Sequence, residues 1–237
     1  MAKAKSNSLP TPRNLLLAAL SASDLSLLRP HLQSVVLALR HEIEAPNVPI
    51  ANVFFMEGGV ASVVAVSSGQ RIEVGLIGRE GMTGTAIVLG NHRSPHATYI
   101  QVAGEGQRIS AARLRTAMAA SGAMKALFLK YVQAFTIQTA HTAIANGRAN
   151  IDERLSRWLL MAQDRIGRRD LPLTHEFLAL MLGVRRAGVT DALSVLEGDK
   201  IIRAVRGKIT VLDRKRLEGK ARDSYGVPEA EYRRLIG

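Results

Sequence analysis

Two kinds of hydrophobic periodicity divide this chain near residue 110. Before that point, short apolar runs alternate with glycine-containing turns, and ten of the 20 glycines lie between Gly58 and Gly106. Short strands separated by tight turns produce this pattern. The expected strands are Val35–Arg40, Val53–Met56, Ala61–Val66, Arg71–Leu76 and Thr98–Val102, preceded by short helices at Asn14–Leu20 and Leu25–Gln33. We therefore predict an antiparallel β domain at residues 14–110, behind a flexible tail at residues 1–13.

From Ala111 onward the apolar positions recur at helical spacing. One stripe contains Leu127, Tyr131, Ala134, Gln138, His141 and Ala145, and a second contains Met124, Phe128, Val132 and Phe135. A helix that is apolar on two flanks packs against two partners. One partner is the β domain, and the other is the same helix of a second protomer; the alternative is a helix buried inside one domain. Polar seam residues set register and favour the interface. We predict a dimerisation helix at residues 111–147, with contact residues Leu127, Tyr131, Ala134, Gln138 and His141.

A break at Asn146–Asn150 precedes a different pattern. Gly147 suits a hinge or a helix end, and Ile151–Ile166 reads as an amphipathic helix. Residues 173–196 then predict two short helices, because Thr174 is a good N-cap and Gly183 permits a sharp turn between them. The inward positions are Phe177, Leu178, Met181, Leu182, Val184, Val189, Ala192, Leu193 and Leu196. Two short helices joined through a glycine turn form a helix-turn-helix, which we place in a C-terminal domain at residues 148–237.

The outward face of the second helix carries chemistry that suits DNA. It presents Arg185, Arg186, Thr190 and Asp191, and an arginine at this place can bind guanine O6 and N7 with two hydrogen bonds. Positive charge at a helix N-terminus opposes the helix dipole, which indicates a use for it. Asp191 could support an arginine one turn away or accept a hydrogen bond from cytosine.

A hairpin follows the helix pair directly. Ile201–Val205 and Lys208–Leu212 flank Arg206-Gly207, which is a turn signal with a basic tip. A hairpin in this place is the wing of a winged helix. Its basic residues Lys200, Arg203, Arg206 and Lys208 are expected to contact phosphates, which gives affinity and salt dependence without sequence choice.

The charge balance agrees with this interpretation. The 237 residues contain 32 Lys and Arg against 20 Asp and Glu, which gives a net charge of +12 and a pI of about 10.7. Such an excess points to nucleic acid or to an anionic membrane surface. Binding to a membrane surface would require an amphipathic helix with a basic polar face. Residues 151–169 partly qualify, but their apolar face is better used for packing on the helix-turn-helix.

Several other classes find no support in the sequence. The absence of cysteine excludes disulfides, thiolate metal sites and cysteine-ligated iron–sulfur clusters. The six histidines form no zinc-binding pair, and no nucleophile elbow, P-loop or dinucleotide fingerprint occurs, so we expect neither a metal site nor an enzyme. The chain contains no apolar run of membrane-spanning length. Prolines interrupt the basic N-terminus before an apolar core can form, so a cytoplasmic protein is expected.

The segments L-T-H-E-F-L-A-L-M-L-G-V-R-R-A-G-V-T-D-A-L and L-E-G-D-K-I-I-R-A-V-R-G-K-I-T-V-L-D resemble the DNA-binding end of the Crp/Fnr transcription regulators, and V-G-L-I-G-R-E-G-M-T-G resembles a strand and turn of that family's β-roll. The resemblance covers roughly residues 14–220. It implies an α+β protein with an N-terminal antiparallel β-roll, a long dimerisation helix and a C-terminal winged helix-turn-helix. It also implies a homodimer that binds near-palindromic double-stranded DNA at promoters, with RNA polymerase as a further partner.

The same resemblance assigns roles to single residues. Arg186 falls where family members read a guanine, and Thr174 where they hold a phosphate. Ala187 and Asp191 depart from the family pattern, so the family's known target sequences do not carry over. In the sensor half, Gly78, Arg79, Glu80 and Gly81 stand where a cyclic-nucleotide cassette begins. Its second element falls near His96-Ala97 or, in another register, at Arg93-Ser94.

This cassette departs from the family pattern at the positions that matter for a nucleotide. Glu80 is displaced by one residue and Arg79 stands in its place, and an arginine fork for the phosphate is missing or misplaced. The resemblance therefore implies a regulator gated by a signal at the β-roll other than ordinary cAMP. The effector stays unidentified. The alternative is a constitutive DNA-binding protein whose β-roll is a protein-docking module.

Overall fold

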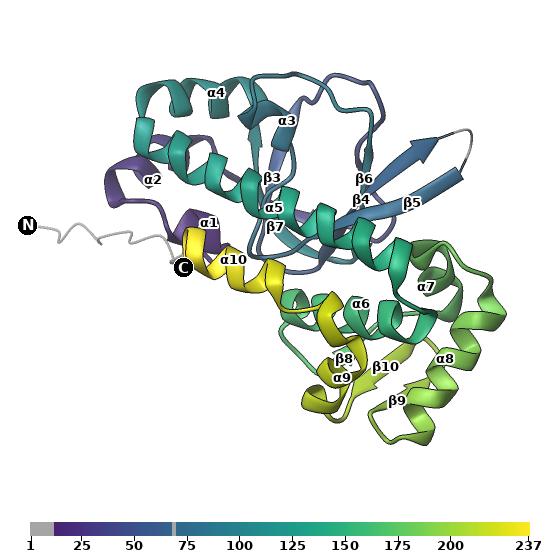
Figure 1. Ribbon diagram of the computed structural model, residues 1–237. Coiled ribbons are helices and arrows are strands. Elements are labelled where there is room, and N and C mark those ends of the chain that lie inside the picture. The colour runs from purple at the N-terminus through teal and green to yellow at the C-terminus, as the bar shows by residue number, and fades with distance from the viewer. Residues whose placement is uncertain (1–11, 68–69) are drawn as a thin grey trace, which may run out of the picture.

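The structure, a computed structural model, describes residues 12–67 and 70–237. Most of the predicted tail, residues 1–11, therefore lies outside the described residues. The described chain is α+β, with antiparallel sheets in its first half, a long helix in the middle and a helix-turn-helix with a hairpin near its end (Figure 1). The predicted fold class is confirmed.

Two short helices and one 3-10 turn precede the sheets, at α1 (Leu15–Ala18), α2 (Ala22–Leu28) and η1 (Arg29–His31). Asn14 explains where α1 begins, because its side chain accepts a hydrogen bond from Leu17 N at 3.0 Å. The same amide donates to Met56 O and Gly81 O, both at 2.8 Å. Asn14 therefore caps the helix and anchors it to the β region.

The first half folds into two antiparallel sheets. One has the order β1-β7-β3 and the other the order β2-β6-β4-β5. Their bounds are β1 (Gln33–Leu37), β2 (Glu42–Glu44), β3 (Asn52–Met56), β4 (Val60–Ser67), β5 (Gln70–Ile77), β6 (Ala97–Val102) and β7 (Gly104–Ser110). Each predicted strand has a counterpart, although β1 lies earlier in the chain than expected. The sequence pattern did not predict β2 or β7.

Gly104 and Gly106 show why β7 was missed. Glycines close together usually indicate a turn, but β7 begins at Gly104 and is the central strand of its sheet. A Cβ at Gly104 would lie 2.3 Å from Gly58 C, and one at Gly106 would lie 2.7 Å from Phe55 O. These glycines therefore serve close backbone packing rather than chain reversal.

Three helices follow or interrupt the sheets: α3 (Thr85–Val88), α4 (Ala111–Ala120) and α5 (Gly122–Arg148). The predicted dimerisation region contains two helices, because Ser121 ends α4 and its side chain accepts a hydrogen bond from Met124 N at 3.1 Å to cap α5. Figure 1 shows α5 lying along the β region.

The stripe expected to meet a second protomer is largely used inside the chain. Tyr131, Ala134 and Gln138 are buried. Gln138 Oε1 accepts from Leu76 N at 2.7 Å, and its Nε2 donates to Leu76 O at 3.2 Å. This corrects the predicted seam. The helical spacing is right, but α5 has apolar residues on more than one flank, so spacing could not say which flank faces the β-roll.

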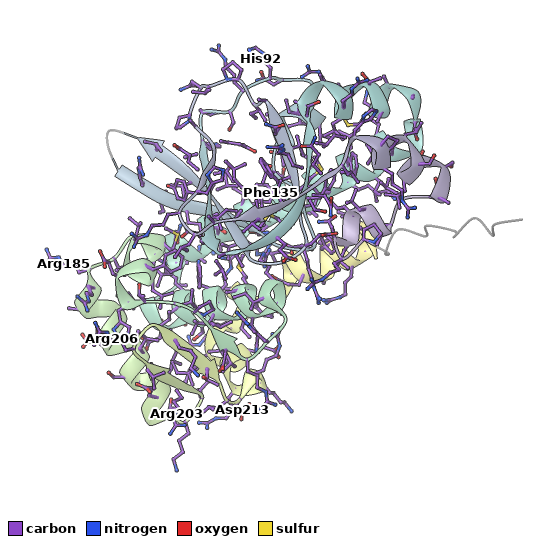
Figure 2. All side chains as sticks on the ribbon, turned by 180° about the vertical axis from the view of Figure 1, so that it is seen from behind. His92, Phe135, Arg185, Arg203, Arg206 and Asp213 are labelled. Atoms are coloured by element: carbon purple, nitrogen blue, oxygen red, sulfur yellow. The ribbon has the colours of Figure 1, made fainter. Side chains whose placement is uncertain are left out.

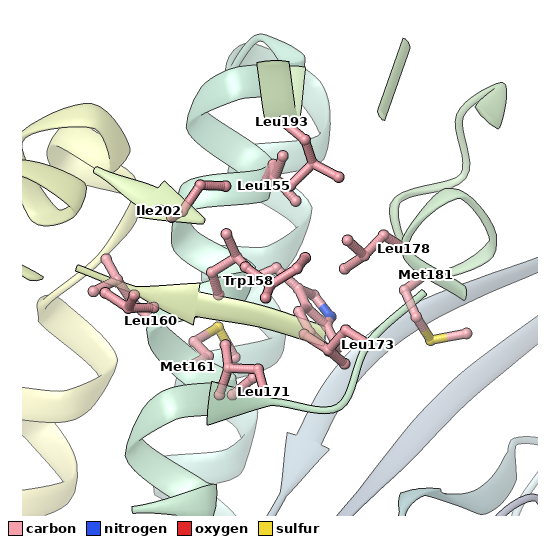
Figure 3. Close-up of a cluster of buried hydrophobic side chains, with 14 of the residues drawn as sticks. Leu155, Trp158, Leu160, Met161, Leu171, Leu173, Leu178, Met181, Leu193 and Ile202 are labelled. Carbon is pink, nitrogen blue, oxygen red and sulfur yellow. The ribbon is translucent and has the colours of Figure 1, made fainter. Parts of the chain in front are cut away.

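The second half contains five α-helices and a small sheet of order β8-β10-β9. Its elements are α6 (Ile151–Ile166), β8 (Asp170–Leu171), α7 (His175–Leu182), α8 (Arg186–Gly198), β9 (Ile202–Val205), β10 (Lys208–Val211), α9 (Arg214–Ala221), η2 (Arg222–Ser224) and α10 (Val227–Ile236). Leu155 and Trp158 of α6 pack among side chains from α7, α8 and the hairpin (Figure 3). The same cluster includes Val60, Leu76 and Val102, so the two halves share one core.

The last helix returns to the first half of the molecule. In Figure 1, α10 runs beside α5 and ends near α1. Tyr232 and Ile236 pack on the N-terminal core cluster, and the Tyr232 hydroxyl donates to Glu80 O at 2.7 Å. This return was not predicted. No helix in the described part of the chain is long and apolar enough to cross a membrane.

Candidate nucleic-acid interface

The helix-turn-helix forms for the reasons that the sequence indicated. Thr174 caps α7 by accepting a hydrogen bond from Phe177 N at 3.2 Å. Gly183 ends α7 with a φ of 62°, in the left-handed region that glycine adopts at little cost. Val189, Ala192, Leu193 and Leu196 are buried and hold α8 against the core. This arrangement leaves the opposite face of α8 in solvent.

The start of α8 is an uncompensated positive site. Arg185 occupies the N-cap position without a side-chain cap, and Arg186 is the first helical residue. Both are exposed, and neither has an acidic partner within 4.0 Å among the described residues. Asp191 does not support either arginine. Free backbone N–H groups and two guanidinium groups at one helix start favour an anionic partner.

Thr190 and His175 brace the two helices of the motif. His175 Nδ1 lies 3.1 Å from Thr190 Oγ1, and Thr190 Oγ1 donates to Arg186 O at 3.1 Å. Sequence reasoning gave Thr190 only an outward role and missed His175. A His and a Thr facing each other across a turn give no periodic signal, so only the folded geometry brings them together.

The hairpin adds a basic edge beside α8. Strands β9 and β10 pair antiparallel, and Gly207 turns the tip with a φ of 74°. Arg185, Arg203 and Arg206 extend outward at the periphery of this half of the molecule (Figure 2). Lys208 lies 3.4 Å from Asp170, which also accepts from Thr210 Oγ1 at 2.7 Å. Asp170 was not predicted, and it partly neutralises Lys208.

All nine residues predicted to contact DNA are exposed in this half of the chain: Thr174, Arg185, Arg186, Thr190, Asp191, Lys200, Arg203, Arg206 and Lys208. Helix α8, whose start is exposed, and the basic hairpin lie next to each other, as in motifs whose second helix enters a DNA groove.

A cavity of about 400 Å³ lies between the β-roll and α5. Its polar lining includes Glu44, Ser94, His96, Thr136 and Thr139, and no lysine or arginine lines it among the described residues. Glu44 is buried, which raises the pKa of its carboxyl, and it accepts from Gly84 N at 2.6 Å. A cyclic phosphate would therefore find a carboxyl group in this cavity and no guanidinium fork.

The structure separates the predicted ligand residues. His96 and Ser94 line the β-roll cavity, whereas Arg79 and Glu80 line a different one beside α6 and α10. The space in front of the Gly78–Gly81 turn is occupied. Arg165 lies against Gly78 and binds Glu80 at 2.9 Å, and Tyr131 lies against Gly81. The predicted cassette residues Gly78, Arg79, Glu80 and Gly81 therefore do not form one site with His96.

Comparisons with known proteins agree with the geometry. Residues 153–219 match the Crp-like helix-turn-helix domain. A comparison with curated protein sequences found no significant match. Among solved structures, a Crp/Fnr-family transcriptional regulator from Eubacterium rectale is similar, with 21% identity, a TM-score of 0.66 and coverage of 88% of this chain and 98% of that chain.

Two further structures have similar folds. FixK2 from Bradyrhizobium japonicum shows 17% identity and a TM-score of 0.65, with 81% of this chain and 98% of that chain covered. The c-di-GMP responsive global regulator CLP from Xanthomonas campestris shows 16% identity and a TM-score of 0.64, with 81% and 99% covered. The chain thus has the fold of the Crp/Fnr transcription regulators, and its residues 153–219 are a Crp-like helix-turn-helix domain.

Proposed function

We propose that this protein is a sequence-specific DNA-binding transcription regulator of the Crp/Fnr type. The observation that carries the proposal is the exposed, unpaired Arg185–Arg186 start of α8 beside the basic wing of a Crp-like domain. In this motif the first residues of the second helix enter the major groove. Arg186 would read guanine through O6 and N7, and Arg203 and Arg206 would contact phosphates.

The experiment that tests this proposal is selection of bound duplexes from a random DNA library at physiological salt. We expect enrichment of a near-palindromic sequence whose half-sites are about 34 Å apart, one turn of DNA. Equal recovery of all sequences would contradict a specific regulator. A single, non-repeated half-site would contradict the dimer but leave the DNA contact in place.

We further propose that the protein acts as a homodimer through the exposed face of α5. Seven exposed residues on that helix recur at alternating spacings of three and four: Ala126, Leu129, Gln133, Thr136, Ala140, Ala143 and Gly147. This is the spacing of a parallel coiled-coil seam, and five of the seven residues are Gly, Ala or Thr, whose small size permits close approach. Dimer-related winged helices could then occupy both half-sites at a promoter, where RNA polymerase would be a further partner.

Replacing Ala140 with glutamate is expected to convert the dimer to a monomer. Two carboxylates would face each other across the seam, where like charges and desolvation oppose association. Analytical ultracentrifugation of the purified protein measures this. Ala112→Glu, at an exposed position on α4 outside the seam, is the matched control and should stay dimeric. An unchanged dimer in Ala140→Glu would contradict this interface.

The β-roll cavity is the proposed place of the signal, and its lining argues for an effector other than cyclic AMP. Thr136 and Ala140 line the cavity and also belong to the proposed seam, so occupancy could alter the helix pairing. We expect millimolar cyclic AMP to leave the unfolding temperature unchanged. Stabilisation near 2.7 kcal/mol, which a ligand gives at ~100 times its Kd, would contradict this expectation. If none of a panel of nucleotides, haem and small effectors stabilises the protein, the result favours the alternative that the β-roll is a docking module.

A further inference from the structure

A second cavity, of about 290 Å³, lies outside the β-roll, where α10 closes against α5 and α6. Its walls come from both halves of the molecule. Arg79 belongs to the turn after β5, Phe135 to α5 and Arg165 to α6, whereas Tyr232 and Arg233 belong to α10. Its size is near the lower end of pockets that hold small organic molecules, about 300 Å³.

Four aromatic side chains line the cavity, and the hydroxyl groups of the three tyrosines among them already form hydrogen bonds within the protein. Tyr131, Phe135, Tyr225 and Tyr232 all line it. The Tyr131 hydroxyl donates to Met82 O at 3.0 Å, the Tyr225 hydroxyl to Asp164 at 2.6 Å and the Tyr232 hydroxyl to Glu80 O at 2.7 Å. Arg214 lies over the Tyr225 ring, 5.7 Å from its centroid, so Tyr131, Phe135 and Tyr232 supply the apolar surfaces that suit a flat apolar group.

Two of the three acidic groups of the lining form ion pairs within the protein. Glu80 lies 2.9 Å from Arg165 Nε, and Asp164 lies 2.8 Å from Arg214 Nη2. Glu229 accepts from Gly226 N at 2.9 Å, where it caps α10. Glu229 is therefore the one acidic group of this lining that forms no ion pair among the described residues.

Two arginines of the lining are not compensated in this way. Arg79 and Arg233 are exposed, and in the described part of the chain neither forms an ion pair. A guanidinium group matches a carboxylate with two parallel hydrogen bonds. Arg79 and Arg233 together outweigh Glu229, so the unpaired charges of the lining sum to one positive charge, and four of the lining side chains are aromatic.

We propose that this cavity is a second ligand site, distinct from the β-roll cavity, that takes a small aromatic carboxylate. The ring packs among Tyr131, Phe135 and Tyr232. The carboxylate binds Arg79 and Arg233. Because the walls belong to α5, α6 and α10, a bound ligand stabilises the arrangement of the β-roll and the winged helix to which it binds best. This effect on DNA binding rests on the proposed function, whereas ligand binding does not.

The test uses the full-length protein without DNA and two isosteric probes, naphthalene-2-carboxylate and the neutral naphthalene-2-carboxamide, in isothermal titration calorimetry. We expect the carboxylate to bind at least tenfold more tightly than the amide. The double variant Arg79→Gln/Arg233→Gln should weaken carboxylate binding by at least tenfold. Arg234→Gln, the neighbouring exposed position on α10 outside the lining, is the matched control and should change binding less than twofold.

Three results would overturn the site. They are equal affinity for the carboxylate and the amide, carboxylate binding that survives Arg79→Gln/Arg233→Gln, and no binding of the carboxylate at millimolar concentration. Circular dichroism of each variant checks that it is folded, and both substituted side chains are exposed. Because no DNA is present, failure here leaves the proposed DNA-binding function standing, and the two can fail separately.

Discussion

Replacing Arg186 with alanine is expected to weaken binding to a selected DNA site by about 30-fold or more and to leave binding to a scrambled duplex nearly unchanged. Each bidentate arginine–guanine contact contributes ~1–3 kcal/mol of discrimination, and the proposed dimer makes two of them. Arg186 is exposed at the first helical position of α8, so its removal should not disturb the fold. Fluorescence anisotropy with labelled duplexes measures both affinities.

Arg206→Ala is the matched control, because Arg206 is an exposed arginine at the wing tip. A phosphate contact carries no sequence information, so this variant should weaken both duplexes alike and reduce the salt dependence by about one charge per protomer. If the two variants change specificity in the same way, α8 is not the recognition helix.

The second large effect concerns Glu73, a fully buried carboxyl where β5 meets α6. Its Oε2 accepts from Ser62 Oγ at 2.5 Å, and its Oε1 accepts from the Trp158 indole at 2.7 Å. Burial raises the pKa of Glu73 to about 7, although these two hydrogen bonds and the charges of Arg157 and Arg165 act in the opposite direction. Glu73 therefore links the β-roll to α6 through its hydrogen bond with Trp158. Its contribution to the free energy of unfolding depends on pH.

Glu73→Gln is expected to remove a loss of stability that the wild-type protein shows as pH rises. The folded pKa of about 7 lies above the ordinary value of 4.5, so between these values the folded state keeps a proton that the unfolded state has lost. The contribution of Glu73 to the free energy of unfolding is therefore highest below pH 4.5 and falls by about 3 kcal/mol up to pH 7. Glutamine keeps an acceptor for Trp158 and can donate to Ser62, so the variant should lack the Glu73 part of this slope and keep the part from Glu44, whose pKa is also raised.

Urea unfolding at pH 5 and pH 8 measures the slope for each protein. Glu42→Gln, at an exposed position on β2, is the control and should retain the wild-type slope. A Glu73→Gln variant with the wild-type pH dependence would show that this carboxyl ionises as easily in the folded state as in the unfolded chain.

The DNA-binding half could be predicted from sequence because its signals are local. Thr174, Gly183 and the apolar positions of α8 each act within one helix or turn, and the hairpin has its own turn signal at Gly207. Side-chain type at fixed spacing then decides both the element and its buried face. This is why the exposed arginines at the start of α8 could be named before the fold was known.

The sensor half could be predicted only in outline, because its decisive contacts join distant segments. Gly104 packs on Gly58, Gln138 binds the backbone of Leu76, and Arg165 fills the space before Gly78. None of these contacts produces a periodic pattern in the amino-acid sequence. For the same reason the flank of α5 that packs on the β-roll could not be identified from the sequence, and the cavity beneath α10 was not foreseen.

The ratio of two dissociation constants tests the central claim most directly. These are the constants of the wild-type protein for the selected palindrome and for a scrambled duplex of equal length, measured at the same physiological salt concentration. Specific regulators bind their sites about 10³-fold or more tightly than other DNA. The account predicts a ratio of at least that size. A ratio near one would contradict it.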